Sequence, residues 1–226
     1  MATRHKGLGA ASALVLPSVE FLASPASSSN LSTYNFTSQP LGTEGSNRYI
    51  VAAFGMRRSN STFPSCACTI NGVSATLLSS RRGTASDADG TYMFIAAVPT
   101  GTSGTVSFGL SLSAICGLAG LWAVYDIESP ALRDVATTSG VDPASMYVDV
   151  LEGDVIIAVA GDYSRSTSSS WTGATEDYDR IISDTNNRSQ SGASFIAEAD
   201  ETSRLVRDNR SVGSTTTQSS ICGIFR

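Results

Sequence analysis

The sequence predicts an all-β protein, and we expect an antiparallel, jelly-roll-like β-sandwich with an extended N-terminal arm. Apolar or alternating runs of about six to nine residues recur from Tyr34 to the C-terminus. Gly, Ser, Thr, Asn and Asp separate these runs, which is the pattern of short strands joined by turns. Long stretches with helical periodicity are missing, which disfavours an architecture of alternating strands and helices.

Individual strands can be placed along the chain. Asn71-Gly72 predicts a tight hairpin, because both turn positions of such hairpins require positive φ. Residues 128–144 are polar, contain two prolines and predict a loop, with one helical turn near Ala131 as a candidate. Trp122 lies in the most apolar run and is expected in the core. The clearest strand runs are Tyr49–Phe54, Thr91–Val98, Leu118–Tyr125, Val155–Ala160 and Ser220–Phe225.

The length suits one large all-β domain or two small ones. The chain has 226 residues, of which 41% are hydrophobic and 15% charged. We assign residues 1–30 to an arm that serves assembly and residues 31–226 to a single β-sandwich domain. The charged fraction lies below the ~25% of an average globular protein. Such a surface suits a subunit that buries part of itself against its own copies, so we expect a homo-oligomer, with a trimer favoured.

The N-terminal arm has no sustained periodicity. Its first residues superficially resemble a secretion signal, but Gly and Ser dilute the apolar stretch, so we expect the segment to be retained. Val19–Leu22 is a candidate strand at a sheet edge. We expect the arm to lie across neighbouring subunits through its apolar anchors, which are Leu14, Val15, Leu16, Phe21 and Leu22.

Charge and hydropathy exclude two classes of partner. The formal net charge is −5, and no run of Lys and Arg exceeds two residues, so we expect no nucleic-acid binding. No stretch reaches the ~20 apolar residues that a membrane-spanning helix requires, so we expect no membrane partner.

Catalytic motifs are missing from the patterned region. The one histidine, His5, lies in the arm, whereas a Ser-His-Asp or Cys-His site needs an imidazole beside the nucleophile. We therefore expect no enzyme, no cofactor and no metal. Cys66 and Cys68 do not match the usual metal spacings. Cys116 and Cys222 lie in apolar runs and are expected to be buried, and a disulfide remains open.

Two acidic stretches allow alternative interpretations. Asp87 and Asp89 have the opening spacing of a calcium loop without its remaining ligands, so a turn is expected and a weak ion site stays open. The second stretch contains Trp171, Glu176, Asp177 and Tyr178. It is expected to be a solvated loop, with a pair of carboxylates for glycoside cleavage as a further possibility. These four residues are also the candidate glycan contact, together with Arg81 and Arg82, which we expect in a loop.

Five stretches resemble a known family: Tyr34–Gly42, Asn47–Ala53, Ile70–Thr76, Ile95–Gly104 and Trp171–Tyr178. They are similar to β-sandwich virion proteins of tailed bacteriophages and prophages, especially those of marine and roseobacter-type hosts. The resemblance spans residues 31–226 and carries no catalytic motif. Members are accessory head proteins and modules of tail fibres.

The resemblance implies a structural protein of the virion, assembled in the cytoplasm of a bacterial host. Its leading form is a capsid decoration or cement subunit that contacts the major capsid protein. The alternative is a tail-fibre or spike module that contacts other tail proteins and binds glycans on the host surface.

Overall fold

The structure, a computed structural model, is built from β-strands. It describes residues 15–83, 89–140, 143–163, 168–182, 188–210 and 218–226. Over these residues the strand content is 68% and the helix content 0%. All pairings between neighbouring strands are antiparallel in the described sheets. The predicted fold class, an antiparallel all-β sandwich, is confirmed.

The first half of the chain forms two sheets. Sheet A has the strand order β1-β10-β4-β8-β7, with β2 also paired to β10, and sheet B has the order β3-β9-β5-β6. The strands are β1 Ser18–Ala23, β2 Ala26–Ser27, β3 Leu31–Pro40, β4 Arg48–Arg57, β5 Cys66–Ile70, β6 Val73–Ser74, β7 Thr76–Arg82, β8 Asp89–Ala97, β9 Ser103–Ala114 and β10 Cys116–Tyr125.

The second half forms two further sheets. Sheet C has the order β11-β18-β13-β16-β15, and sheet D has the order β12-β17-β14. The strands are β11 Asp134–Ser139, β12 Ala144–Val150, β13 Val155–Tyr163, β14 Trp171–Thr172, β15 Thr175–Ile182, β16 Arg188–Ile196, β17 Glu201–Asp208 and β18 Ser219–Phe225.

The two halves share one topology. With the short β2 and β6 set aside, each half has eight strands in chain order. In both halves the larger sheet runs first, eighth, third, sixth, fifth, and the smaller sheet runs second, seventh, fourth. Most successive strands therefore change sheets, as in a jelly roll. The single sandwich predicted for residues 31–226 is instead a tandem of two jelly-roll-like sandwiches, because each half closes its own pair of sheets.

Local details repeat as well. The fifth strand of each half carries a β-bulge against the sixth, at Leu78 in β7 and at Asp177 in β15. Gly55 of β4 and Gly161 of β13 both lie against the guanidinium group of Arg188. If these two glycines are taken as equivalent positions of the two halves, the strand registers make the two bulges equivalent as well.

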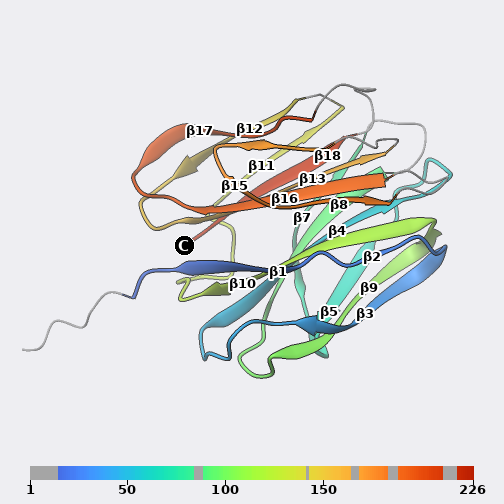
Figure 1. The fold of residues 1–226 in the computed structure, drawn as a ribbon, viewed down its shortest axis with the longest axis horizontal. Coiled ribbons are helices and arrows are strands. Elements are labelled where there is room, and N and C mark those ends of the chain that lie inside the picture. Colours follow the sequence, from blue (N-terminus) through green and yellow to red (C-terminus); the bar gives the residue numbers. More distant parts are fainter. Residues whose placement is uncertain (1–14, 84–88, 141–142, 164–167, 183–187, 211–217) are drawn as a thin grey trace, which may run out of the picture.

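The sheets stack in four layers in the order B, A, C, D (Figure 1). Sheets A and B enclose an aromatic core in which Phe54 and Phe108 stack with ring centroids 4.3 Å apart. A second core lies between sheets A and C, and a third between sheets C and D. Strands β4 and β13 are covered on both faces, which explains why their sequences are continuously apolar rather than alternating.

The sandwiches pack through sheets A and C with reciprocal contacts. Strand β8 lies against β18, and its counterpart β16 lies against β10, the counterpart of β18. Likewise β7 lies against β11, while Phe21 of β1 stacks on Tyr178 of β15. Such reciprocity is the mark of a twofold interface, here formed within one chain.

The structure corrects the boundary of the arm. Residues 18–23 form β1, which pairs with β10 along the edge of sheet A, and β2 pairs with the same strand. The candidate edge strand at Val19–Leu22 is confirmed, and the arm predicted over residues 1–30 does not project from Ser18 onward. A four-residue segment with three apolar side chains does not reveal a partner about a hundred positions away, so the sequence left this pairing open.

Two shorter predictions have opposite outcomes. Asn71 and Gly72 have φ values of 50° and 81° and join β5 to β6, so the predicted hairpin is confirmed. The expected loop over residues 128–144 contains β11 and the start of β12, and a helical turn at Ala131 is not present. The pairing of β11 with the C-terminal strand β18 decides this conformation.

Candidate functional site

The predicted glycan-contact residues do not share one exposed surface. Tyr178 is buried between sheets A and C, where its ring stacks on Phe21 with centroids 5.4 Å apart. Trp171 is half-buried and packs against the core between sheets C and D. Of the four predicted residues, Glu176 alone is exposed. Burial of Tyr178 contradicts a sugar-stacking face at this place.

A β-bulge explains where the carboxylates point. Asp177 is the extra residue in β15, and a bulge of this kind re-aims a side chain. Its Oδ2 accepts the indole N–H of the fully buried Trp122 at 2.7 Å. Burial raises the pKa of Asp177, although the hydrogen bond from Trp122 opposes the rise. The predicted acidic loop is thus a strand whose central carboxylate joins the two sandwiches.

The remaining members of the acidic stretch differ in their surroundings. Asp179 accepts the backbone N–H of Ser169 at 2.8 Å, so it fixes the segment that leads into β14. Glu176 is exposed, and desolvation together with the charge of Asp179 raises its pKa. Asp177 and Asp179 thus each have one carboxylate oxygen engaged in a hydrogen bond within the protein.

The Arg and Asp residues named beside these sites have structural contacts. Arg81 lies on β7, not in a loop, and donates to the hydroxyl of Ser139 at 2.7 Å, while Arg82 is exposed. Asp89 is fully buried and forms an ion pair with the equally buried Arg188, which corrects the open ion-site interpretation for this residue. Asp87 lies outside the described residues.

The Asp89–Arg188 pair crosses from sheet A to sheet C. Asp89 begins β8 and Arg188 begins β16, and these are counterpart strands of the two sandwiches. Burial, with the charges of Arg210 and Arg57, lowers the pKa of Arg188 to about 9. The pair therefore holds two opposite charges at equivalent positions of the interface, away from water.

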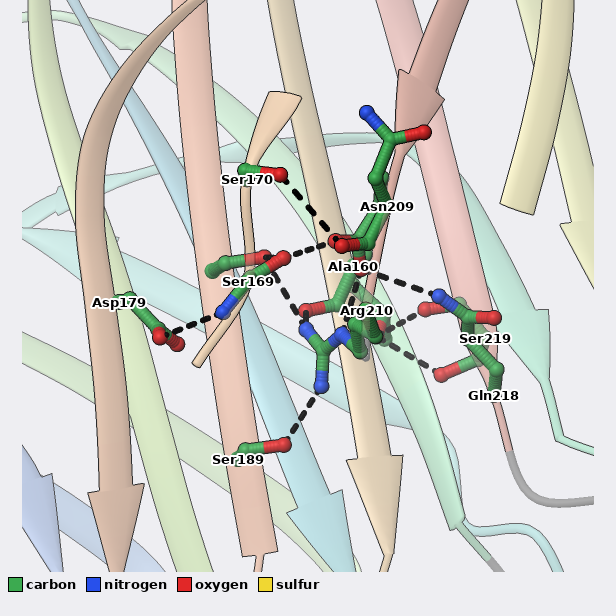
Figure 2. Close-up of polar contacts among 12 residues, drawn as sticks. Ala160, Ser169, Ser170, Asp179, Ser189, Asn209, Arg210, Gln218 and Ser219 are labelled. Atoms are coloured by element: carbon green, nitrogen blue, oxygen red, sulfur yellow. Dashed lines mark hydrogen bonds and ion pairs between the residues drawn. The ribbon is translucent and has the colours of Figure 1, made fainter. Parts of the chain in front are cut away.

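A second buried arginine organises the neighbouring part of sheet C (Figure 2). Arg210 donates from Nε to Asp208 at 2.5 Å and from Nη1 to the hydroxyl of Ser189 at 2.5 Å. Its Nη2 donates to the carbonyl of Ala160 at 2.6 Å and to the hydroxyl of Ser191 at 3.0 Å. Burial alone would lower the pKa of Arg210, but the charge and hydrogen bond of Asp208 raise it overall.

The guanidinium group of Arg210 is bonded to other groups of the protein, so this residue stabilises the packing of the surrounding strands. Asp208 also accepts from the amide of Gln218 at 3.0 Å and from the hydroxyl of Ser169. The network thereby ties β13, β16 and β17 to the segments that precede β14 and β18. This network could not be predicted from the sequence, because its members are single polar residues spread over about fifty positions.

The four cysteines are free thiols. Cys116 and Cys222 are fully buried, as predicted, and the disulfide alternative is not realised. Burial raises the pKa of Cys66 to about 12 and, with Asp134 adding to the effect, raises that of Cys222 to about 12. Burial also raises the pKa of Cys68. Thiols with such values carry little thiolate, the reactive form, near neutral pH.

The predicted assembly anchors fall into three groups. Leu14 lies outside the described residues. Val15 and Leu16 are 66% and 64% exposed, immediately before β1. Phe21 and Leu22 are half-buried on β1, where Phe21 packs into the core between sheets A and C and Leu22 into the core between sheets A and B.

The chain just before β1 lies close to the C-terminus (Figure 1), and Val15 and Leu16 lie beside Arg226. They line a shallow depression of about 100 Å³ together with Gly153 and Arg226. Leu16 also borders a depression of about 390 Å³ with Leu151, which is 37% exposed. An apolar patch of Val15, Leu16 and Leu151 therefore faces solvent. Its rim carries Arg226 and four acidic side chains: Asp126, Glu128, Glu152 and Asp200.

Metal clusters and membrane-spanning helices are both missing from the described residues. Their His, Cys, Asp and Glu side chains do not gather into a group of three that could hold a metal ion. In the same part of the chain, a helix that could span a membrane does not occur.

Comparison with known proteins gives little similarity. No family model matches the sequence, and no curated protein matches it. Among solved structures, the PBSX exported protein XepA aligns with 92% of this chain and 86% of its own, at 10% identity and a TM-score of 0.23. A TM-score of 0.23 does not establish a common fold, so the function must be argued from the residues of this chain.

Proposed function

We propose that the protein is a structural assembly subunit, and in particular a capsid decoration or cement subunit of a tailed-phage virion. The observation that carries the assembly role is the exposure of Val15 and Leu16, at 66% and 64%, directly before a strand that is firmly paired. Two adjacent large apolar side chains beside exposed Leu151 form a patch of the kind that marks contact sites.

The body of the molecule suits a mechanical role. Three stacked cores and the interlocked sheets A and C give a rigid block with contacts between residues far apart in sequence. The chemically versatile buried groups, including Asp89, Arg188 and Arg210, are engaged with each other or with neighbouring protein groups. Such a block can hold an exposed N-terminal segment at a fixed place while that segment contacts another subunit.

The virion assignment rests on the resemblance of residues 31–226 to accessory virion proteins of tailed phages. In that setting the partners are the major capsid protein and further copies of this chain, a trimer being the favoured oligomer. Many weak contacts of this kind become strong when they are linked on one shell.

The test is the occupancy of this protein on purified virus particles. The double variant Val15→Asp/Leu16→Asp keeps β1 intact, so the fold is expected to be retained. We expect its occupancy to fall well below that of the wild type. The matched control is Val73→Asp, which places the same charge on a side chain that is 41% exposed at the β5–β6 hairpin. Unchanged occupancy of the double variant would refute the assembly role of this segment.

A further inference from the structure

An apolar groove lies on the side of the molecule where β7 and β11 meet. It has a volume of about 280 Å³, and Leu77 and Leu78 of β7 form one wall. Pro130, Ala131 and Leu132, which precede β11, form the opposite wall. Leu77 is 46% exposed, and the nearby Val135 of β11 is 45% exposed.

The internal duplication gives the groove side of the interface a counterpart on the opposite side. On the opposite side of the interface, Phe21 pairs with Trp122, and Tyr178 pairs with Gly192. The counterpart pairs on the groove side are Val135 with Gly223, and Ser79 with Met93.

The aromatic rings of Phe21, Trp122 and Tyr178 therefore fill the side of the interface opposite the groove. Val135, Gly223 and Ser79 occupy the matching positions on the other side, where Met93 alone is larger than its counterpart. The space at Gly223 is taken instead by Leu132 and Met93, because a Cβ atom there would lie 2.8 Å from Cδ2 of Leu132 and 3.0 Å from Sδ of Met93. Leu132, together with Leu77 and Leu78, lines the groove.

The protein's own apolar N-terminal residues cannot fill this groove. Val15 and Leu16 are held beside Gly153 and Arg226, next to β1. Strands β1 and β7 are opposite ends of sheet A, four strand spacings apart, which corresponds to about 19 Å. The chain before Leu14 has only Met1 and Leu8 as large apolar side chains. The exposed Val15 and Leu16 can therefore fill such a groove only on another molecule.

We propose that the groove between β7 and Pro130–Leu132 receives Val15 and Leu16 of a second copy of this chain. The two residues are adjacent and apolar, and Val15 is β-branched, which suits insertion beside the end strand of a sheet. The donor site and the acceptor site lie at different places on each copy, so the contact joins unlike surfaces and builds a ring if the rotation closes. This inference rests on the proposed assembly role and names its partner.

The test mixes two variants that are defective at opposite sites. Leu77→Glu blocks the groove and keeps the N-terminal segment. It should be tolerated, because the matching position in the second sandwich is Glu176. Val15→Asp/Leu16→Asp disables the segment and keeps the groove. Circular dichroism checks the fold of each variant, and Val73→Asp serves as the control.

We expect sedimentation to show self-association of the wild type and the control. Each defective variant alone should associate at least about tenfold more weakly. An equimolar mixture of the two should regain a one-to-one complex, since it pairs an intact segment with an intact groove. A wild type that stays monomeric, or a mixture that gains no complex, would overturn the inference.

The outcome is separable from that of the proposed function. A wild type that occupies virus particles but remains monomeric in solution would refute the contact between copies and leave the assembly role standing. A complex that forms through the groove, with no protein found on particles, would refute the virion role and leave the contact between copies standing.

Discussion

Trp122 of β10 donates its indole N–H to Asp177 of β15 across 2.7 Å, and this bond joins the two sandwiches. The tryptophan is fully buried, and its ring also lies 5.9 Å from those of Phe21 and Tyr178. The acidic stretch that resembles a surface loop in sequence is in this way part of the central interface.

Removal of the acceptor should destabilise the protein. Asp177→Ala leaves the indole N–H of Trp122 buried without its partner, which is expected to cost about 1–3 kcal/mol of unfolding free energy. Asp177→Asn keeps an oxygen acceptor without the charge and should be close to neutral. Urea denaturation of both variants measures the difference, and equal destabilisation by Asn and Ala would contradict the role of the hydrogen bond.

The same carboxyl predicts a pH dependence. Burial raises the pKa of Asp177 in the folded protein above its unfolded value, so the folded state binds the proton more tightly. Stability from this group is therefore greatest below the unfolded pKa and declines as the pH rises through the folded pKa. Asp177→Asn should flatten that decline. If the stability of the Asn variant falls with rising pH over the acidic range as steeply as that of the wild type, Asp177 is not the source of the pH dependence.

The buried ion pair should show strong coupling. Asp89→Ala or Arg188→Met alone leaves an uncompensated charge and should cost about 3–5 kcal/mol, whereas the double variant should cost less than the sum. Glu201→Ala is the control, because Glu201 forms an exposed ion pair with Arg204 and should contribute under about 1 kcal/mol. Additive effects of the two buried substitutions in denaturation experiments would show that the charges are not coupled.

Glycine at position 192 should be required for the packing of the aromatic rings. A Cβ atom there would collide with Tyr178 and lie 2.8 Å from Cζ2 of Trp122. Gly192→Ala should therefore cost about 1–3 kcal/mol. Gly109→Ala is the matched control, since its Cβ would meet no heavy atom within 4 Å, and it should change stability by less than about 0.5 kcal/mol. Similar thermal midpoints for the two variants would be inconsistent with the packing described.

Native thiols should be unreactive. The pKa of Cys66 and of Cys222 is raised to about 12 by burial, so at pH 8 their reaction with a disulfide reagent should be slow. In denaturant, all four cysteines should react, because none forms a disulfide. Rapid native labelling of any thiol at pH 8 would contradict its burial.

The sequence predicts the strands better than their arrangement. Short-range signals such as Asn71-Gly72, and continuous runs such as Tyr49–Phe54, specify local structure and are confirmed. The duplication is hidden, because the interface pairs unlike residues at matching positions. Trp122 corresponds to Gly223, and Asp89 corresponds to Arg188, so complementarity across the interface has replaced similarity between the halves.

The sequence predicts only part of the candidate site, because the burial of several of its residues depends on the tertiary structure. The exposed anchors Val15 and Leu16 follow from apolar residues in a segment without periodicity. Phe21 and Tyr178 could not be assigned from the sequence, since their burial depends on β1 and β15 meeting across two sheets. The groove on β7 likewise depends on Leu77 and Leu78 meeting Pro130–Leu132, and only the folded chain brings those segments together.

The most direct test of the assembly role is electron cryo-microscopy of purified virus particles at subunit resolution. The proposed role predicts density for this four-layered block on the shell lattice, with the N-terminal segment reaching from Val15 onto a neighbouring subunit. Density confined to the tail tip, or particles that lack the protein, would contradict a capsid decoration subunit.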